Sequence, residues 1–515
     1  MRRRWSLFIL NFVLAWFISF ISGDVEAADV SFEHLKDIDV QRIVKDIKTL
    51  SHENFQGRQA GTVGGQKSAD FVIRRFEHLG ILPAGEAQEG MERSWVQQRP
   101  LSATVVSDEV TANFTVIRQS RQPYDVNLRL KADFLPVLDS PSVNVTAPVV
   151  FVGYGIDDPA RGINDYQGLN VRNRIVLFLR GKPTSYSRWV THEEKEQTAR
   201  KHGAAGFITL TGPLLNRYEA RRGLANIPLA MYSAAPDTRP LPGIWISGNV
   251  GDTLFTSQEL SLNDIQTRLN EGKPVPVQDL GIVAHWRWQS QKTSGKLINI
   301  LGTLPGQDPV LRKEIILIGA HRDHFGKQAG LVFAGADDNA SGTALLLELA
   351  RLLEAHKTDL KRTIVFAAFD GEERGLLGSK LYVQNPTHPL HNIFTMINID
   401  HVGAGNGKLT VGLTRIPQSM GARAADQAGL SERVSLYGYF PGGDHVPFYE
   451  AGVPTVTVVS SGTHAHFHQP SDTGDTIQPA VLERAARYAL ALTWMFATGH
   501  KDDWFEESSS SDSRS

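Results

Sequence analysis

The second half of this chain constrains its fold most, because short and wholly apolar runs alternate there with loops and helix-like segments. The runs at 315–318 and 363–369 predict strands, and further strands are expected at 394–399 and 453–459. Ala340 to Leu353 has the apolar spacing of an amphipathic helix. Strands without polar alternation are buried on both faces, so this half predicts an α/β fold with a mostly parallel mixed sheet between layers of helices.

The rest of the chain shows two further patterns. Between Asp37 and Ile81 the apolar residues recur at helical spacing, which predicts two helices. From about Ala132 to Val283, short β-like runs are separated by turn residues, which predicts a separate and mainly β module. We therefore expect an α/β domain built from residues 35–130 and 285–500, interrupted by a mainly β domain at 131–284.

Both ends of the chain differ in composition from a folded domain. Residues 1–27 carry arginines, then an apolar run, then a small-residue cleavage site before Ala28, which predicts a signal for export to the periplasm or the cell exterior. The apolar run is shorter than the ~20 residues that span a bilayer, so we favour cleavage over an uncleaved anchor and expect no stable membrane association afterwards. The serine-rich stretch 501–515 is expected to be a disordered tail.

Two features of the composition restrict the function. The 55 acidic and 53 basic residues nearly cancel, so no long-range field attracts a polyanion, and we expect no nucleic-acid partner. The chain has no cysteine, which excludes disulfides and thiolate metal sites. Any metal must therefore be bound by His, Asp and Glu side chains.

Side chains of these types follow the predicted strands or precede the predicted helix. They are His321, Asp337, Glu372, Glu373, Asp400 and His468. Ligands of open α/β sheets bind beyond the carboxyl ends of the strands, so these residues are expected along one edge. Carboxylates and imidazoles without sulfur suit a hydrolytic pair of zinc, manganese or cobalt ions.

Each of these residues also has a simpler interpretation when it is taken alone. Asp337 could belong to a helix N-cap, and Glu372 and Glu373 could complement a helix dipole. His321 could be a hydrogen-bonded histidine at a strand end. Independent caps and turns have no reason to converge on one edge of a sheet, however, so the joint placement favours a metal site.

At the level of whole motifs, the sequence resembles the zinc aminopeptidase family M28 with an inserted protease-associated (PA) domain. The strings that resemble the peptidase family occur in the family's order and lie between about Lys296 and Ala497. They are Gly319–His324, Gly335–Gly342, Phe369–Glu373, Gly375–Ser379, Ile397–Asp400, Asp444–Phe448 and His468–Thr473. The strings that resemble a PA domain are Val149–Gly155, Gly168–Leu177 and Lys201–Gly206.

The resemblance implies two zinc ions per chain, with cobalt or manganese as possible substitutes. Asp337 would bridge both ions, and the peptide bond between Asp337 and Asp338 would be cis, as it is at the matching position in the family. The remaining ligands would be divided between two sites, with His321 and Asp400 at one and Glu373 and His468 at the other.

The resemblance also implies catalytic roles. Glu372 would be the general base toward a metal-activated water, and Asp323 would orient His321 through the far nitrogen of its ring. Tyr439 is a candidate for binding the oxyanion, and Arg322 is a candidate for contacting the substrate at the entrance. The expected activity is removal of the amino-terminal residue of a peptide or small protein.

Other functions stay open at this point. Relatives with PA domains include carboxypeptidases, glutaminyl cyclases share the core but use a single zinc, and the transferrin-receptor relatives bind without catalysis. The complete ligand set with Glu372 argues against the last two. The module at 131–284 offers no cluster of ligand-type residues, so we expect it to control substrate access rather than to take part in catalysis. Side-chain preference and oligomeric state do not follow from the sequence.

Overall fold

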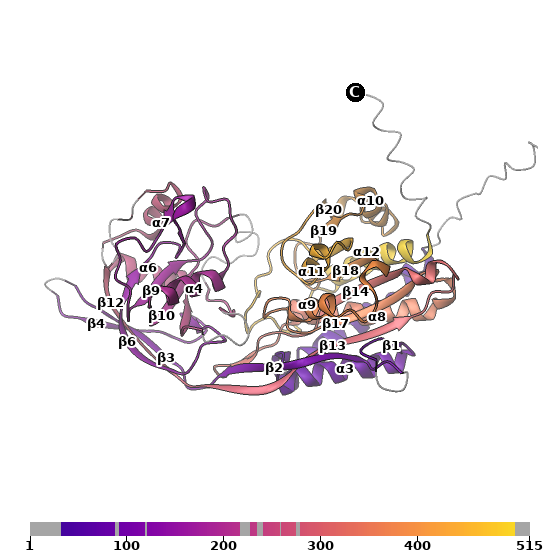
Figure 1. The fold of residues 1–515 in the computed structure, drawn as a ribbon, viewed down its shortest axis with the longest axis horizontal. Coiled ribbons are helices and arrows are strands. Elements are labelled where there is room, and N and C mark those ends of the chain that lie inside the picture. The colour runs from indigo at the N-terminus through magenta and orange to yellow at the C-terminus, as the bar shows by residue number, and fades with distance from the viewer. Residues whose placement is uncertain are drawn as a thin grey trace, which may run out of the picture.

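The chain forms two units, each built around its own sheet, in a computed structural model (Figure 1). The structure describes residues 32–87, 92–118, 121–216, 227–233, 240–257, 259–273, 275 and 279–499. The predicted export signal and the predicted tail lie outside these ranges. We call the unit with the nine-stranded sheet the α/β unit and the unit with the eight-stranded sheet the β-rich unit.

The sheet of the α/β unit is parallel at its centre, where β14 pairs with β17 and β18, and β18 pairs with β21. Antiparallel strands flank this centre, so the sheet is mixed. In sheet order the strands are β1 (Leu82–Pro83), β13 (Ser290–Leu304), β17 (Thr363–Phe369), β14 (Ile315–His321), β18 (Ile393–Ile399), β21 (Thr455–Ser460), β19 (Leu409–Thr414) and β20 (Val434–Tyr437), with β2 (Val96–Val106) paired to β13.

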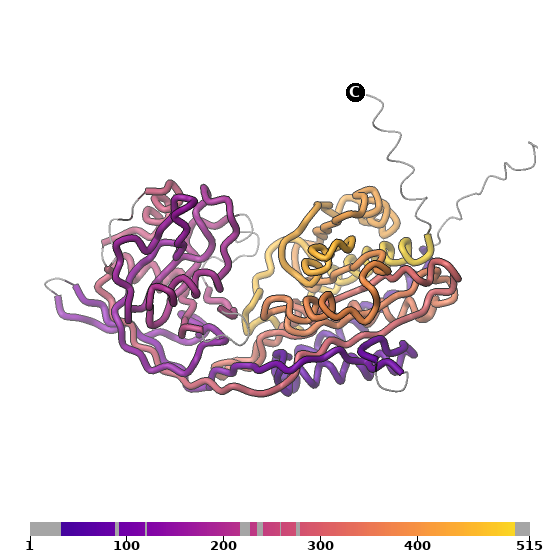
Figure 2. The backbone as a smooth tube through the Cα atoms, viewed as in Figure 1, coloured from indigo at the N-terminus to yellow at the C-terminus, as the bar shows by residue number. Residues whose placement is uncertain are grey.

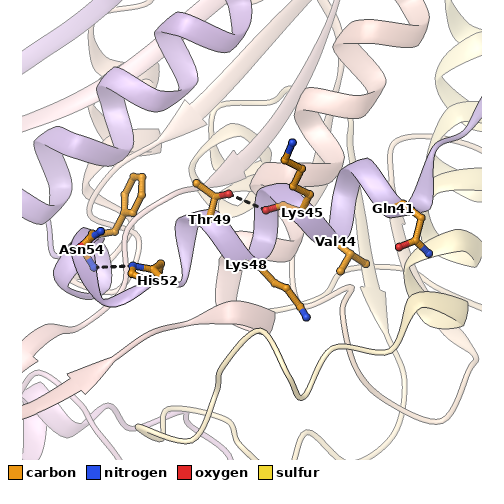
Figure 3. A pocket seen from close by; sticks show the side chains of 8 residues that line it. Gln41, Val44, Lys45, Lys48, Thr49, His52 and Asn54 are labelled. Atoms are coloured by element: carbon orange, nitrogen blue, oxygen red, sulfur yellow. Dashed lines mark hydrogen bonds between the residues drawn. The ribbon is translucent and has the colours of Figure 1, made fainter.

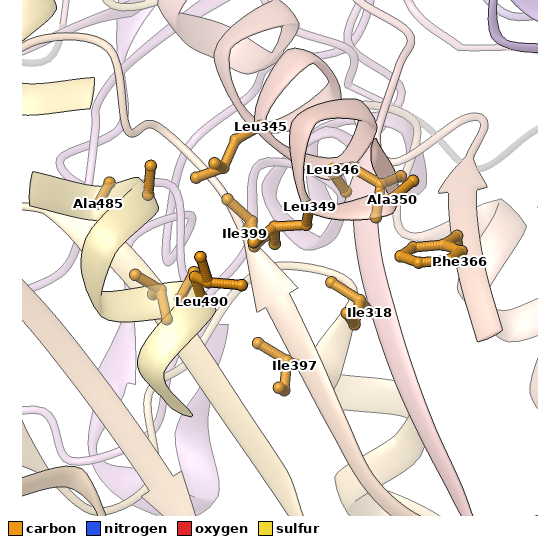
Figure 4. Close-up of a cluster of buried hydrophobic side chains, with 14 of the residues drawn as sticks. Ile318, Leu345, Leu346, Leu349, Ala350, Phe366, Ile397, Ile399, Ala485 and Leu490 are labelled. Atoms are coloured by element: carbon orange, nitrogen blue, oxygen red, sulfur yellow. The ribbon is translucent and has the colours of Figure 1, made fainter. Parts of the chain in front are cut away.

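Helices cover both faces of this sheet because each central strand is apolar on both sides. On one face lie α2 (Val40–Leu50), α3 (Val63–Leu79), α8 (Ser341–Ala355), α10 (Gln418–Gln427) and α12 (Pro479–Thr498). Figure 4 shows Leu345 and Leu349 of α8 packed near Ile318 and Ile399 of the strands. On the other face lie α9 (Leu377–Gln384) and α11 (His445–Glu450). The predicted α/β fold with a mostly parallel mixed sheet between helices is confirmed.

The β-rich unit contains a second mixed sheet. In sheet order its strands are β4 (Tyr124–Asn127), β3 (Thr111–Val116), β12 (Asp279–Trp288), β6 (Val143–Phe151), β9 (Ile175–Leu179), β10 (Gly206–Leu210), β11 (Gly243–Ile246) and β5 (Phe134–Pro136). Its helices are α4 (His192–Lys201), α6 (Gly248–Thr256) and α7 (Leu262–Asn270). β3 and β4 precede residue 131, so the sheet extends beyond the segment in which we predicted a mainly β domain.

Two long strand pairs join the units. β2 pairs with β13 in the α/β unit, and β3, the next strand after β2, pairs with β12, the strand before β13. Figure 2 shows both chain segments running side by side from one unit to the other. The chain thus enters and leaves the β-rich unit at neighbouring points of one continuous ribbon.

Short elements complete the fold. The remaining strands are β7 (Asp157–Asp158), β8 (Ile163–Asn164), β15 (Gly326–Gln328) and β16 (Leu331–Phe333). The short helical turns are η1 (Glu33–Asp37), η2 (Glu53–Arg58), η3 (Pro159–Arg161), η4 (Leu311–Lys313), η5 (Ala336–Ala340), η6 (Lys357–Asp359), η7 (Leu390–Asn392) and η8 (Ser431–Arg433). Across the described ranges, no helix has both the length and the apolar character needed to cross a membrane.

Candidate metal centre

Imidazoles and carboxylates gather where the central strands of the α/β unit end. His321 is the last residue of β14, and Asp400 directly follows β18. Glu372 and Glu373 lie in the loop after β17, and His468 lies in the loop after β21. Because these strands are parallel, their carboxyl ends meet at one edge of the sheet.

One group of donor atoms surrounds Oδ1 of Asp338. Nε2 of His321 lies 3.3 Å from this oxygen and 3.3 Å from Oδ1 of Asp400. All three side chains are at most 13% exposed. Three donor atoms at these separations can face one cation, because ligands of a tetrahedral zinc site lie a little over 3 Å apart when each bond is about 2.0–2.2 Å.

A second group of donor atoms surrounds the other oxygen of Asp338. Nε2 of His468 lies 3.3 Å from Oδ2 of Asp338 and 3.6 Å from Oε2 of Glu373. The carboxylate of Asp338 therefore lies between the two groups, with one oxygen turned toward each. A carboxylate in this position could bridge two cations.

The prediction that Asp337 is the bridging residue does not fit this geometry. Oδ2 of Asp337 lies 2.5 Å from Nδ1 of His464, and Oδ1 accepts a hydrogen bond of 2.8 Å from the backbone N–H of Gly403. Both oxygens of Asp337 are thus engaged away from His321 and His468. The predicted cis peptide bond is also displaced by one residue, because it lies between Asp338 and Asn339.

Four hydrogen bonds between backbone groups and side chains hold the loop that carries Asp338 in place. Asp472 accepts hydrogen bonds from the N–H groups of Asp337 and Asp338, at 2.9 and 3.0 Å. Asn339 donates from its side-chain amide to the carbonyl of Ile399 and accepts from the N–H of Gly342 in the first turn of α8. The start of α8 and the end of β18 therefore fix the position of this carboxylate.

The chemistry of Asp338 supports a cation between these side chains. Oδ2 of Asp338 is buried and, within the described part of the chain, has no hydrogen-bond partner. Although burial favours the protonated form, the imidazoles of His401, His321 and His468 hold the pKa of Asp338 well below its usual range. Burying an ionised carboxylate is costly unless a cation or hydrogen-bond donors face its oxygens. The donor set of His, Asp and Glu suits zinc, cobalt or manganese.

Glu372 lies beside both groups of donor atoms around Asp338 but belongs to neither. Its carboxylate is within 4.8 Å of donor atoms of His321 and Glu373, and its backbone N–H donates to Oδ1 of Asp323 at 3.1 Å. Burial raises the pKa of Glu372 well above its usual range, His321 partly opposes the shift, and nearby Asp400 adds to it. A carboxyl group that readily holds a proton is suited to general acid–base chemistry.

Asp323 lies on the far side of the His321 ring from the donor cluster. Oδ1 of Asp323 is 3.7 Å from Nδ1 of His321, and the backbone carbonyl of Asp323 is 3.3 Å from the same nitrogen. The closer atom is the carbonyl, so it is the better placed to accept a proton from Nδ1. Asp323 also links the ring to Glu372 through the backbone contact described above.

A cavity of about 330 Å³ opens beside the donor cluster. Both polar and apolar residues line it. The lining residues are Asp338, Glu372, Glu373, Gly375, Leu376, Asn398, Asp400, His401, Phe440, Pro441, Gly442, Gly443, Thr457, Val459, Phe467 and His468. In the described residues, neither Lys nor Arg lines it, so the lining offers no guanidinium or ammonium group to bind an anionic end of a substrate.

A larger hollow of about 580 Å³ lies on the surface of α2 and differs in character (Figure 3). Its side chains include Lys45, Lys48 and His52. None of the described residues that line it is a carboxylate. This hollow therefore lacks the donors of a metal site, and the smaller cavity is the better candidate for catalysis.

Two predicted substrate contacts are not supported by the structure. Arg322 is fully buried and donates to the carbonyl of Gly65 at 2.6 Å, and it pairs with Asp370 at 2.9 Å. It therefore ties α3 to the sheet and does not line the entrance. Tyr439 is 47% exposed and packs on Tyr449, while its neighbour Phe440 lines the cavity.

Several buried histidines at this edge were not among the predicted site residues. His401 lines the cavity, and its Nε2 lies 3.6 Å from Oδ1 of Asp338 and 3.7 Å from Oδ1 of Asp400. Nδ1 of His324 lies 2.6 Å from Oε1 of Glu373. Nδ1 of His464 lies 2.5 Å from Oδ2 of Asp337. The one available signal was their position, because each lies within a few residues of a predicted ligand.

The α/β unit matches a known family and known sequences. Residues 299–493 match the sequence profile of peptidase family M28. Aminopeptidase YwaD of Bacillus subtilis is 29% identical over 210 residues, which are 38% of this chain and 44% of that protein. A probable zinc metalloprotease of Pyrenophora tritici-repentis is 29% identical over 212 residues, which are 32% of this chain and 44% of that protein. This chain thus spans less than half the length of these two relatives.

A probable leucine aminopeptidase of Arthroderma otae is matched over more of its length. It is 25% identical over 328 residues, which are 60% of this chain and 90% of that protein.

Solved structures share the fold of both units. An aminopeptidase from Aneurinibacillus sp. strain AM-1 aligns with a TM-score of 0.63 and 21% identity over 90% of this chain and 96% of that one. BSAP, a zinc aminopeptidase from Bacillus subtilis, aligns with a TM-score of 0.58 and 20% identity over 89% and 95%. Because the alignments cover about nine-tenths of this chain, they extend to the β-rich unit as well as to the α/β unit.

Proposed function

Residues 299–493 of this chain belong to peptidase family M28, and from this premise we propose that the protein is a metal-dependent aminopeptidase with two zinc ions. The observation that carries the proposal is the carboxylate of Asp338, which has one oxygen toward His321 and Asp400 and the other toward His468 and Glu373. Two cations on either side of one carboxylate are a recurrent arrangement for hydrolysis. Cobalt and manganese suit the same donors.

The protein's own residues would divide the remaining tasks. A pair of cations, when bound, lowers the pKa of a water molecule and polarises the carbonyl that the water attacks. Glu372 would accept the proton of that water at its carboxylate and then return it to the leaving amine. Asp323 would hold His321 in one ring orientation, through its carbonyl and its carboxylate.

The lining of the cavity favours an aminopeptidase over a carboxypeptidase. No lining residue in the described ranges carries a positive side chain other than histidine. A carboxypeptidase has to bind the terminal carboxylate of its substrate, for which an arginine or a lysine is the suitable partner. The names of the relatives agree with this reading. A carboxypeptidase of the same family is the second candidate, and the substrate in either case is a peptide.

Export is a further part of the proposal. The signal predicted at 1–27 would direct the chain to the periplasm or the cell exterior. The PA-like character of the β-rich unit likewise rests on the sequence strings given above. Comparing the amino terminus of the mature protein with Ala28 tests the first point directly.

Activity is expected to disappear on chelation and to return when zinc, cobalt or manganese is added, because every proposed ligand is an imidazole or a carboxylate. The measurement is hydrolysis of amino-terminal p-nitroanilides beside carboxyl-terminal dipeptides, before and after treatment with a chelator. Hydrolysis of the anilides alone supports an aminopeptidase, and hydrolysis of the dipeptides alone supports the carboxypeptidase. Full activity in metal-depleted protein rules out both.

A further inference from the structure

A short segment of the β-rich unit reaches the metal centre of the other unit. This segment, residues 228–232, is anchored in the β-rich unit: the N–H of Leu138 donates to the carbonyl of Met231 at 3.0 Å. The next residue, Ser233, donates its N–H to Asp139 at 3.0 Å. Leu229 packs against Trp245 of β11. The segment therefore moves with the β-rich unit, and we call it the 228–232 segment.

The 228–232 segment is hydrogen-bonded to the loop that carries the candidate ligand His468. The N–H of Ala230 donates to the backbone carbonyl of His468 at 3.0 Å. The carbonyl of Ala230 lies 3.1 Å from Nδ1 of the His468 ring. The side-chain amide of Gln469 donates to the carbonyl of Pro228 at 2.5 Å. Backbone, ring and neighbouring side chain are thus all bound by one short stretch of the other unit.

Apolar contacts enclose the same ring. The rings of Phe467 and His468 stack with centroids 3.7 Å apart, and Phe467 also packs with Leu229 of the segment. Phe325 meets the ring of His468 at 79° with centroids 4.7 Å apart, and Phe325 shares a buried cluster with Ala230. Contacts of this kind restrict rotation of an imidazole about its side-chain bonds.

The hydrogen bond to Ala230 has a chemical consequence for the ring. A neutral imidazole carries one N–H, and donating it from Nδ1 to a carbonyl leaves the lone pair on Nε2. Nε2 of His468 is the atom that lies 3.3 Å from Oδ2 of Asp338. Outer partners of this type fix the tautomer and orientation of a metal-binding histidine. His321 receives the corresponding support from Asp323, within its own unit.

We propose that the β-rich unit completes the metal centre, with the carbonyl of Ala230 acting as a positioning group for His468. The proposal rests on the proposed function in so far as His468 binds a cation. It differs from the role in substrate access that the sequence led us to expect for the inserted module. Breaking the direct contacts of the 228–232 segment with His468 and Gln469 should weaken the site of Glu373 and His468 and leave the site of His321 and Asp400 intact.

The test is Ala230→Pro, which removes the N–H that donates to His468 and displaces the adjoining carbonyl. Metal content is measured after dialysis against a series of chelator concentrations, for zinc and for cobalt, together with the visible spectrum of the cobalt form. We expect one ion to keep its wild-type affinity and the other to bind about 10–100-fold more weakly. Hydrolysis of an amino-terminal anilide should recover at high zinc concentration.

The matched control is Ser233→Ala, which removes the hydroxyl that donates to Asp139 within the β-rich unit. In the described contacts, the side chain of Ser233 touches neither His468 nor Gln469. If Ser233→Ala weakens one site as much as Ala230→Pro does, the effect is a general loosening of the unit and the proposal is wrong. The proposal is equally wrong if Ala230→Pro retains both ions at wild-type affinity.

A second variant covers the case in which Ala230→Pro does not fold. Gln469→Leu acts from the other side by removing the donor to Pro228, without changing the backbone of the segment. It should weaken the same single site, and wild-type affinity at both sites contradicts the proposal. Metal affinity answers this question even if the wild-type protein hydrolyses no peptide. Failure of the proposed function is therefore distinguishable from failure of the positioning role.

Discussion

Replacing Glu372 by Gln is expected to lower kcat by about 10²–10⁴ while both ions stay bound, because a positioned acid–base group contributes a factor of this size. The amide of Gln keeps the size of the side chain but cannot accept a proton at neutral pH. The substitution leaves the proposed metal ligands Asp338, Asp400 and Glu373 unchanged. The measurements are turnover of an amino-terminal anilide and metal content of the purified variant.

Glu373→Gln is the matched comparison, since it makes the same chemical change at the neighbouring residue. Oε2 of Glu373 lies 3.6 Å from Nε2 of His468, so this variant should lose metal from one site. If Glu372→Gln sheds metal and Glu373→Gln retains it, the two roles are exchanged. If neither variant changes turnover, the catalytic assignment of Glu372 and Glu373 is wrong.

Asp338→Ala is expected to abolish turnover and to lose both ions together, because its two oxygens face the two groups of donors. Asp337→Ala should behave differently. Asp337 binds His464 and the N–H of Gly403, so its loss should weaken metal binding by no more than the about 10–100-fold that supporting residues contribute. Metal analysis at saturating zinc checks both variants.

The pair of variants separates the two adjacent aspartates. Two ions in Asp337→Ala and none in Asp338→Ala supports the bridging role of Asp338. The opposite result restores the prediction from sequence that Asp337 is the bridging residue. One ion firmly bound to Asp338→Ala contradicts a bridge at this position altogether. Circular dichroism of both variants shows whether each remains folded.

The fold of the α/β unit could be predicted because its strands are apolar on both faces. The run predicted at 363–369 is β17 residue for residue, and the run at 315–318 is the first part of β14. The helix predicted at 340–353 is α8, which spans Ser341–Ala355.

The contact between the β-rich unit and His468 could not be predicted from the sequence. Ala230 offers only backbone atoms to that contact, and the identity of a side chain says nothing about them.

The sequence predicted where the candidate site lies, but not which side chains point into it. Adjacent residues point in different directions according to their backbone angles, so a pair such as Asp337 and Asp338 does not reveal which carboxylate faces the metal. Arg322 was predicted to contact the substrate at the entrance, because an arginine is buried only where it has partners. Those partners, Gly65 and Ser68, come from α3, more than two hundred residues earlier in the chain. Contacts of that range do not appear in a local motif.

The pairing of β2 with β13 also affects how the molecule is made. β2 ends at Val106 and β13 begins at Ser290, so during synthesis the first strand leaves the ribosome long before its partner exists. Closing so long a loop costs conformational entropy, and an unpaired strand is prone to associate with other chains. The β-rich unit lies between them, and its own pairing aligns Thr111 with Arg287. Once this unit has folded, the two ends of the loop are already neighbours, so the inserted unit serves as a template that brings the two halves of the α/β unit into register.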